Sequence, residues 1–345
     1  MFVSGTSIRF SGKDMTFSTR MNETGTRLSA MLRTAFCAGV REALEDPATI
    51  EIMANPDGSV WIERAGIGID LADFSLAGED RERVIRLVAS SLGESISKSV
   101  PVISAELPGS GERFEGIMPP VSTAPCFSIR KASETAFTLN DYAETGTLSR
   151  SLALALREAV AARANILIAG GTSSGKTTFA NALLREPSLE GDRIVVLEDT
   201  RELNPPAANA IRLRTVPGAV SLQQLVRSTL RLRPDRIVVG EVRGGEALDL
   251  LKAWNTGHPG GITTLHANSA SGALRRLEQL TAEATRVPPH DLIGEAIDVV
   301  VFMSRVGSTR RIEEALRVSG FNGGDYVSEP LVLPKLSLVK HGDMT

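Results

Sequence analysis

The sequence predicts an α/β protein with two folded domains, the larger of which contains a mostly parallel sheet with helices on both faces. The chain has 345 residues, enough for two or three ordinary domains. From about residue 147 onward, short apolar runs alternate with helical patterns, as in a parallel sheet that is covered on both sides. Before residue 131, the order of paired strands and two helices is typical of a smaller α+β domain.

The composition excludes some classes of function. Lys and Arg number 38 against 41 Asp and Glu, for a net charge of -3, so the chain is no globally basic nucleic-acid binder. Hydrophobic residues make up 42%, which permits a sizeable core. Only 4% of the residues are aromatic, so platforms that stack single-stranded bases are not expected.

The cysteines and the apolar runs bear on the cellular compartment. Cys37 and Cys126 lie too far apart in the sequence for a zinc ribbon or a CxxC redox motif, and two cysteines fit a reducing compartment. No apolar run approaches the ~18 residues of a transmembrane helix, and the N-terminus lacks the apolar core of a signal peptide. We therefore expect a soluble cytosolic protein that can dock on a membrane machine.

Local patterns place the elements of the smaller domain. Residues 1–25 are rich in Ser, Thr and Gly and are expected to be a disordered lead-in. Apolar residues then recur at helical spacing, and a Pro-Asp-Gly sequence lies between two alternating runs, which is a hairpin pattern. We expect this domain over 26–131, with a helix over 26–45, a hairpin over 50–64, a helix over 79–97, a hairpin over 102–121 and a strand over 126–131.

The larger domain is expected over 147–320, after a polar, turn-rich linker over 132–146 and before a C-terminal tail over 321–345. Near-continuous apolar runs predict its buried strands. The expected strands are 165–170, 193–199, 210–216, 236–241, 261–267 and 298–305. Helices are expected over 147–163, from residue 176, and near 221–232, 245–256 and 270–284.

A phosphate-binding loop is the most specific motif. Residues 170–177, Gly-Gly-Thr-Ser-Ser-Gly-Lys-Thr, match GxxxxGK[ST], between a predicted strand and a predicted helix. Glycines let backbone N–H groups surround an anion, and the helix N-terminus favours the same negative charge. We expect Lys176 to reach the β- and γ-phosphates and Thr177 to hold Mg²⁺. The expected nucleotide-binding residues are Gly170, Gly171, Thr172, Ser173, Ser174, Gly175, Lys176, Thr177 and Thr178.

Acidic residues end two of the predicted strands. Glu198 and Asp199 end one apolar run, and Glu241 ends another. Ligands of such sheets lie beyond the carboxyl ends of the strands, where a carboxylate orients water or holds Mg²⁺ through its hydration shell. The alternative is that the strand ends are polar only because the chain reaches the surface. Which acid would act as the base stays open.

Histidines and arginines form weaker candidates. His258 and His266 flank a Gly-rich turn and a strand, and a histidine there either contacts the γ-phosphate or an acid, or is only structural. Their spacing is wrong for a compact metal pair. Arg113, Arg130 and the arginines of 227–243 either reach phosphate across a domain or subunit boundary, or form surface ion pairs. Contact of the 227–243 arginines with DNA is a less favoured third interpretation.

The ordered motifs resemble the secretion-superfamily ATPases of type II and type IV secretion, type IV pili and conjugation. The resemblance rests on Walker A at 170–177, an "Asp box" at 198–202, an atypical Walker B ending in Glu241, and a "His box" at 257–268. The sequences AWNTGHPGG and SGFNGGDYVSEPL resemble most closely the TrbB-type conjugal-transfer branch of type IV secretion. ERFEGIMPPV and FSIRK extend the similarity into the smaller domain.

The resemblance implies a RecA-like ATPase domain and a hexameric ring, with ATP and Mg²⁺ held between the two domains of each subunit. It also implies a location at the cytoplasmic face of the inner membrane, partners among the membrane components of the apparatus, and no stable direct binding of nucleic acid. The implied roles are phosphate and metal binding by Lys176 and Thr177, organisation of water and Mg²⁺ by Glu198 and Glu241, phosphate sensing by His258 and His266, and approach to the γ-phosphate by Arg113 and Arg130.

These implications lead to one main hypothesis, an ATP-hydrolysing motor that powers a type IV secretion apparatus for conjugal DNA transfer. A pilus-retraction motor is a close alternative. A nucleotide-gated assembly protein with slow hydrolysis is another. A DNA translocase shares the same type of fold, but the net acidity and the few aromatic residues argue against it.

Overall fold

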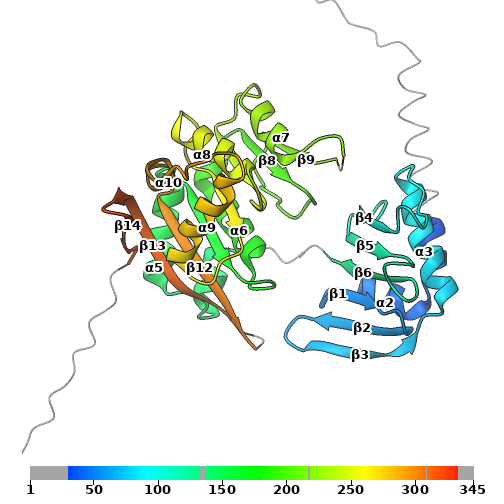
Figure 1. The fold of residues 1–345 in the computed structure, drawn as a ribbon. Helices are drawn as coiled ribbons and strands as arrows, with labels where there is room; N and C mark the ends of the chain where they lie inside the picture. Colours follow the sequence, from blue (N-terminus) through cyan, green and yellow to red (C-terminus); the bar gives the residue numbers. More distant parts are fainter. Residues whose placement is uncertain (1–29, 132–136, 217, 308, 333–345) are drawn as a thin grey trace, which may run out of the picture. The chain divides into compact units, whose positions relative to one another are not determined.

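The computed structural model describes residues 30–131, 137–216, 218–307 and 309–332 (Figure 1). The chain divides into two compact units, Met1–Glu134 and Thr135–Thr345, and each unit has its own sheet and core. The division falls inside the segment 132–146 that the sequence predicts as a linker. The expected lead-in over 1–25 lies outside the described residues.

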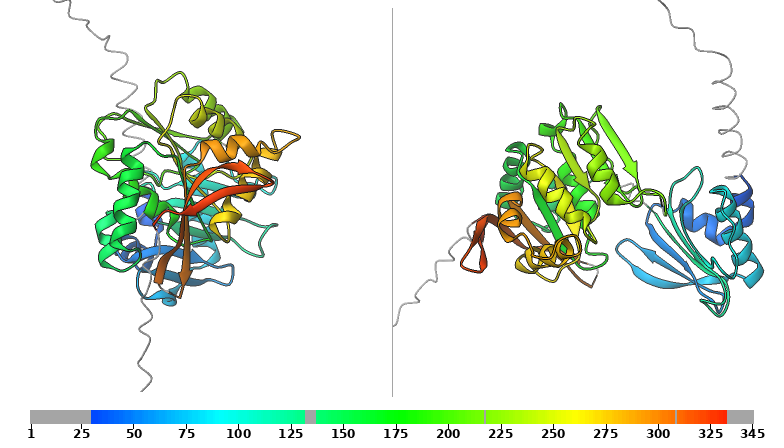
Figure 2. Two further views of the ribbon diagram at one scale, coloured as in Figure 1. Left: turned by 90° about the vertical axis from the view of Figure 1, so that its left-hand side faces the viewer. Right: turned by 45° about the horizontal axis from the view of Figure 1, so that its top comes forward.

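The N-terminal unit is a six-stranded antiparallel sheet with its helices on one face (Figure 2). The sheet has the order β3-β2-β1-β6-β5-β4. Alternate strand residues pack with the helices in one apolar core. The elements are α2 (Ala38–Glu45), β1 (Thr49–Ala54), β2 (Ser59–Arg64), β3 (Gly68–Ser75), α3 (Gly78–Ser91), β4 (Val102–Glu106), β5 (Arg113–Ile117) and β6 (Cys126–Arg130).

The predicted hairpin over 50–64 is confirmed as β1 and β2. Its turn depends on Gly58, whose φ of 93° is readily available only to glycine. The carboxylate of Asp57 accepts hydrogen bonds from both the backbone N–H and the hydroxyl of Ser59, at 2.9 and 2.7 Å. Strand β3 was not expected from the sequence, because it is an edge strand whose Ile69 and Leu71 are exposed and whose burial does not follow a simple alternation.

The helix expected over 26–45 is interrupted in its described part. Residues 30–35 are helical, Cys37 is extended, and α2 begins at Ala38. Leu32 and Phe36 are buried before the break, and Val40 is buried after it. The Arg41 guanidinium donates to the carbonyl of Phe36 at 2.7 Å, so the backbone group freed by the break keeps a partner.

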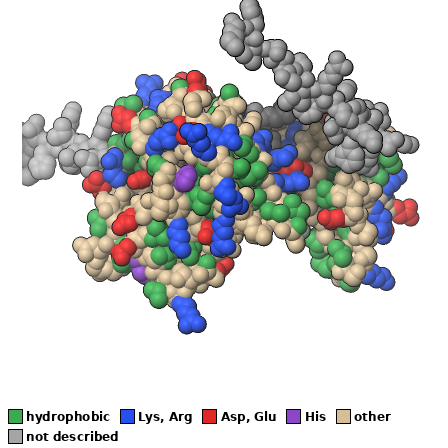
Figure 3. Space-filling model, turned by 90° about the horizontal axis from the view of Figure 1, so that it is seen from above, with side chains coloured by type: hydrophobic (Ala, Val, Ile, Leu, Met, Phe, Trp, Pro, Cys, Tyr) green, Lys and Arg blue, Asp and Glu red, His purple; other side chains and the backbone are tan. Residues whose placement is uncertain are grey.

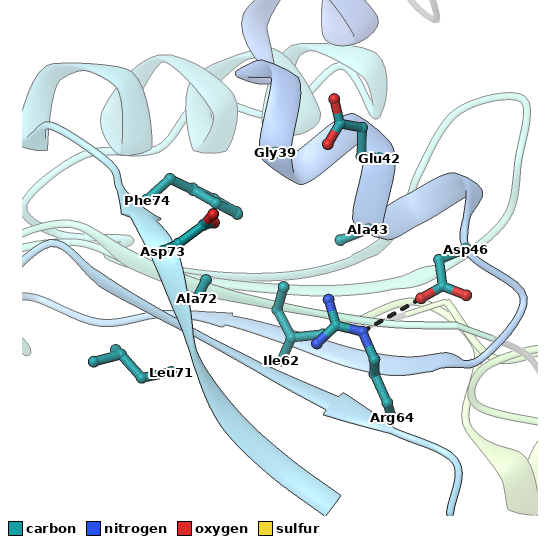
Figure 4. A pocket seen from close by; sticks show the side chains of 10 residues that line it. All are labelled: Gly39, Glu42, Ala43, Asp46, Ile62, Arg64, Leu71, Ala72, Asp73 and Phe74. Atoms are coloured by element: carbon teal, nitrogen blue, oxygen red, sulfur yellow. Dashed lines mark hydrogen bonds and ion pairs between the residues drawn. The ribbon is translucent and has the colours of Figure 1, made fainter. Parts of the chain in front are cut away.

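A pocket of about 460 Å³ lies in this unit between α2 and the strands β2 and β3 (Figure 4). Figure 4 shows the Phe74 ring directed towards Gly39, where a Cβ would overlap it. Glycine at this position therefore allows the helix to approach the strand. Arg64 and Asp46 form an ion pair of 3.3 Å at the other end of the pocket.

The C-terminal unit is an eight-stranded sheet of order β14-β13-β12-β7-β11-β10-β8-β9. The six strands from β12 to β9 run parallel, whereas β13 and β14 are antiparallel, so the prediction of a mostly parallel sheet is confirmed. The strands are β7 (Ile166–Gly170), β8 (Ile194–Glu198), β9 (Ala210–Arg214), β10 (Arg236–Val239), β11 (Ile262–Leu265), β12 (Val299–Val306), β13 (Thr309–Asn322) and β14 (Asp325–Pro330).

Helices cover both faces of this sheet, as predicted. Ile166 and Ile168 of β7 pack in one core with α4, α5 and α6, whereas Leu167 and Ala169 pack in the other with α7 to α10. The period of two along each strand divides the apolar residues between the two cores. The helices are α4 (Leu139–Glu144), α5 (Arg150–Ala161), α6 (Lys176–Leu184), α7 (Leu222–Thr229), α8 (Glu246–Asn255), α9 (Ala270–Ala282) and α10 (His290–Ala296).

Two predicted boundaries of this unit differ from the structure. Helix α4 lies within the predicted linker over 132–146, because Leu139 and Tyr142 are buried in the core and Thr138 forms a capping box with Asp141. Strand β14 lies within the predicted tail over 321–345, because it pairs with β13. Both elements are short, and their order depends on packing against distant parts of the chain.

Candidate nucleotide-binding and catalytic site

The predicted phosphate-binding loop connects the central strand β7 to α6. A Cβ at Gly170 would overlap the carbonyl oxygen of Met303, so a side chain does not fit there. Gly175 caps α6 with a φ of 94°, and Ser173 also has a positive φ, of 59°. Positive φ is uncommon for serine, and such strain is concentrated at functional sites. The loop thus has the tight, side-chain-poor backbone that an anion cradle requires.

Lys176 points back over this loop. Its side chain is largely buried, and Nζ donates to the carbonyl oxygens of Gly170 and Gly171 at 3.0 and 2.9 Å. The ammonium group therefore lies at the mouth of the loop, beside the N-terminus of α6. The hydroxyl of Ser174 is buried without a hydrogen-bond partner. Such a group in a loop of this kind is consistent with a polar ligand.

Glu198, the last residue of β8, is a buried carboxylate of which one oxygen is hydrogen-bonded and the other is not. Its Oε1 accepts the backbone N–H groups of Glu202 and Leu203 at 2.9 and 2.8 Å, while its buried Oε2 has no hydrogen-bond partner. Burial raises the pKa of Glu198 from 4.5 to about 7. Gly240 allows the end of β10 to pass beside it, since a Cβ there would lie 3.0 Å from Cγ of Glu198.

Glu241 follows β10 and lies between an arginine and a histidine. Its Oε2 accepts a hydrogen bond of 2.6 Å from Nη2 of Arg243, and its Oε1 lies 3.0 Å from Nε2 of His266. Arg243 also lies 3.5 Å from Asp199, at the end of the neighbouring strand β8. The structure therefore brings Asp199, Glu241 and His266 together, and Arg243 links the end of β8 to the end of β10.

His266 lies in the field of the phosphate-binding loop. Burial and then the charge of Lys176 lower its pKa, while Glu241 opposes this shift. The imidazole is therefore favoured in its neutral form near neutral pH. Glu241, His266 and the loop that holds Lys176 all follow strands of the parallel sheet, so they lie beyond the same carboxyl edge. A parallel sheet holds its ligands at this edge.

His258 lies elsewhere, so its expected contact with the nucleotide needs correction. It precedes β11, whereas His266 follows it, and β11 runs parallel to β7. The residue therefore lies at the amino edge of the sheet, opposite the loop. It is not placed to contact a phosphate held by the loop of the same unit. Two histidines eight positions apart look equivalent in sequence, but the strand between them separates them.

The arginines of 227–243 do not act as one cluster. Arg236 is 2% exposed, forms a 2.5 Å ion pair with Asp192 and donates to two carbonyl groups, so it is structural. Arg227 pairs with Asp249 at 3.1 Å. Figure 3 shows basic side chains gathered on the face that is uppermost in Figure 1. Among these arginines, Arg243 is the one that the described contacts place at the acids.

Arg113 and Arg130 lie in the N-terminal unit, where they are direct cross-strand partners on β5 and β6. Phe114 and Ile129, their neighbours along the strands, are buried in the core. Because side chains alternate along a strand, both arginines belong to the other face of the sheet, which the core does not cover. The same cross-strand row continues to Glu106 beside Arg113 and to Glu51 beside Arg130, so a carboxylate flanks the arginine pair on each side.

Sequence reasoning missed two features of the site. One is the link that Arg243 makes between the acids, although its position two residues after a strand-end acid was a signal. The other is Arg310 of β13, whose Nε lies 3.4 Å from the carbonyl oxygen of Ser173 in the loop. Nothing local marks Arg310, because it is far from the loop in the sequence.

Comparisons with known proteins agree with this arrangement. Residues 44–310 match the family described as "Type II/IV secretion system protein". The chain is 48% identical to a probable conjugal transfer protein TrbB of Sinorhizobium fredii (strain NBRC 101917 / NGR234) over 305 residues, which covers 88% of this chain and 93% of that protein. It is 32% identical to the type IV secretion system protein VirB11 of Bartonella quintana (strain Toulouse) over 317 residues, covering 79% of this chain and 88% of that protein.

A solved structure of the pilus retraction motor PilT with bound ADP has a similar fold. The TM-score is 0.55 at 20% identity, over 84% of this chain and 80% of that one. At this identity the similarity concerns the fold alone. Across the described residues, no helix is both long and apolar enough to cross a membrane. The extent of the family match and the identity to TrbB lead to one conclusion: the chain belongs to the type II/IV secretion system protein family.

Proposed function

We propose that the protein hydrolyses ATP to ADP and phosphate and thereby powers a type IV secretion apparatus for conjugal DNA transfer. One observation carries the enzymatic part. Glu241 lies 3.0 Å from His266 at the same carboxyl edge as the loop of Lys176, and the buried Glu198, whose pKa burial raises to about 7, ends the neighbouring strand β8. The relatives named as conjugal transfer and type IV secretion proteins support the biological role.

The loop supplies the binding of the triphosphate. Lys176 exchanges its two carbonyl partners for the β- and γ-phosphates, and the backbone N–H groups of 170–178 and the N-terminus of α6 contact the same chain of phosphates. Mg²⁺ fits this site, since it prefers oxygen donors and keeps several waters. The Thr177 hydroxyl would hold it directly and Glu241 through water. When bound there, Mg²⁺ would supply positive charge against the charge that develops on the phosphates.

Glu198 is the general base in this proposal. The oxygen of a water forms a bond to the γ-phosphorus, the bond from that phosphorus to the β–γ bridging oxygen breaks, and ADP leaves. The water proton passes to Oε2 of Glu198, the oxygen that has no hydrogen-bond partner. A pKa near 7 suits this task, because a base works best when its pKa is close to the working pH. Glu241 and His266 orient the water and the phosphate.

The mechanical part of the proposal involves both units. Arg113 and Arg130 approach the γ-phosphate from an N-terminal unit. Hydrolysis removes this contact and lets the two units move relative to each other. Their adjacent positions on the open face of the sheet support this role. We further propose a hexameric ring at the cytoplasmic face of the inner membrane, bound to membrane components of the apparatus and without stable direct binding of nucleic acid.

A pilus-retraction motor is less well supported. The similarity to PilT, at 20% identity, concerns the fold, whereas a conjugal transfer protein is 48% identical. The remaining alternative is an assembly protein in which nucleotide binding suffices. Glu241→Gln separates the two, because it keeps the size of the side chain and removes the charge. Loss of plasmid transfer in a complementation assay supports the motor, and full transfer supports the assembly protein.

The enzymatic proposal is tested by Mg²⁺-dependent turnover of ATP in the purified protein, alone and with its assembly partners. Lys176→Ala should abolish turnover while the circular dichroism spectrum and the melting temperature stay close to those of the wild type. Lys252→Ala is the matched control, since Lys252 is exposed on α8. Absence of turnover in the wild type under all these conditions would overturn the proposal.

A further inference from the structure

Arg310 contacts the phosphate-binding loop from β13. Its Nε lies 3.4 Å from the carbonyl oxygen of Ser173, and its Cδ would lie 2.9 Å from a Cβ at Gly175. The side chain is half-buried, so part of it is accessible to a ligand. A cation thus lies directly beside the turn where the loop enters α6.

The order of the sheet places Arg310 on the opposite flank of the loop from the acids. Glu198 ends β8, Glu241 follows β10 and His266 follows β11, and these three strands all lie on one side of β7. Strands β12 and β13 lie on the other side. Since the terminal phosphate must lie beside the acids for hydrolysis, the α-phosphate and the nucleoside extend towards β12 and β13.

The surroundings of Arg310 fit this end of a nucleotide. Burial raises the pKa of the Tyr142 hydroxyl in α4, and the charge of Arg310 opposes this rise. The Tyr142 ring packs edge-on against Phe179 of α6, with centroids 5.3 Å apart. The contact with the Ser173 carbonyl holds the arginine against the loop backbone. A guanidinium in a fixed position binds phosphate oxygens through two parallel hydrogen bonds, which a flexible ammonium does not do.

We propose that Arg310 is a nucleotide-binding residue that contacts the α-phosphate of a nucleoside di- or triphosphate. This inference rests on the proposed function, because it takes its orientation from hydrolysis at the acidic side of the loop. It adds a side-chain contact on the flank of the loop that faces β12 and β13. Arg310 contributes to affinity for the whole nucleotide and takes no part in the chemical step.

The test compares ligands that do and do not extend to the α-phosphate. The dissociation constants of ATP, ADP and pyrophosphate are measured by calorimetry, with Mg²⁺, for the full chain and for Arg310→Ala, Arg310→Lys and Arg311→Ala. Arg311 is the control, since it is the exposed neighbour on the same strand. Melting temperatures show that each variant is folded, and Arg310→Lys keeps the charge should the alanine variant fail to fold.

We expect Arg310→Ala to raise the dissociation constants of ATP and ADP about tenfold, equivalent to about 1.4 kcal/mol, and that of pyrophosphate less than about twofold. KM for ATP rises by the same factor while kcat stays within about twofold. Arg310→Lys recovers part of the affinity, and Arg311→Ala changes none of these values.

Two results would overturn the inference. An equal loss for all three ligands would show that Arg310 only supports the loop, and no loss for any of them would show that it has no contact. A wild-type protein that binds ATP but does not hydrolyse it leaves the affinity test intact and contradicts the proposed function instead. A wild-type protein that binds none of the three ligands contradicts both.

Discussion

Replacement of Glu198 by Gln has two predicted effects, one on the free energy of unfolding and one on the rate of hydrolysis. The carboxylate is 4% exposed, and one of its oxygens lacks a hydrogen-bond partner, so its charged form is costly to bury. Burial raises its pKa from 4.5 to about 7. The folded protein therefore binds a proton that the unfolded chain has already released, between these two pH values. Glutamine keeps the shape and carries no charge at any pH.

The sign and size of the effect follow from the two pKa values. The contribution of Glu198 is fully present below about pH 4.5 and is lost as pH rises through about 7. Between pH 5 and pH 8, the free energy of unfolding of the wild type should fall by about 2.5 kcal/mol relative to Glu198→Gln. Over the same range the base becomes ionised, so kcat/KM of the wild type should rise about tenfold from pH 6 to pH 8, with its midpoint near pH 7.

Urea unfolding of both proteins at several pH values measures the first effect, and steady-state hydrolysis measures the second. The difference between the two proteins removes the contributions of all other titrating groups. Glu198→Gln should lose turnover by at least about a hundredfold at every pH. If the difference in unfolding free energy between the wild type and Glu198→Gln stays constant from pH 5 to pH 8, the pKa of Glu198 is not raised in the folded protein. A pH-independent kcat/KM would remove it from the role of base.

Two further predictions concern arginines that the sequence grouped together. Arg243→Ala should lower kcat/KM for ATP hydrolysis by about ten- to a hundredfold, because Glu241 loses a charged partner at 2.6 Å. Arg227→Ala, which removes a pair with Asp249, should change kcat/KM by less than about twofold. Equal effects of the two substitutions in the hydrolysis assay would contradict the placement of Arg243 in the site. Arg236→Ala should lower the free energy of unfolding by about 3 kcal/mol, because Oδ2 of the largely buried Asp192 loses its charged partner and two buried carbonyl groups lose a donor, while Arg163 still pairs with Oδ1. A loss below about 1 kcal/mol in urea titration would show that the ion pair is not important.

Much of the fold and of the site could be predicted because the signals are local. Ile166–Gly170 reads as a buried strand since its residues are apolar without interruption, and the burial of all five confirms this. The glycines and Lys176 of the loop follow from the chemistry of phosphate binding. The acids at 198 and 241 follow from the rule that parallel strands end at one edge. None of these inferences needs a long-range contact.

Other features depended on packing between distant segments. Helix α4 and strand β14 have too few residues for a strong pattern, and they are ordered by the core and by β13. His258 and His266 appear equivalent in the sequence, and only the direction of β11 separates them. A one-dimensional pattern carries no information on which edge of a sheet a loop reaches until the strand directions are known.

The sequence alone determined the family, the loop that binds phosphate and the alternation of strands and helices, because each depends on residues that are close together along the chain. The tertiary structure decided the pKa of Glu198, the contact of Arg243 with Glu241 and the position of Arg310 beside the loop. These depend on burial and on distances of a few ångströms between separate strands. Such quantities exist only once the sheet has formed.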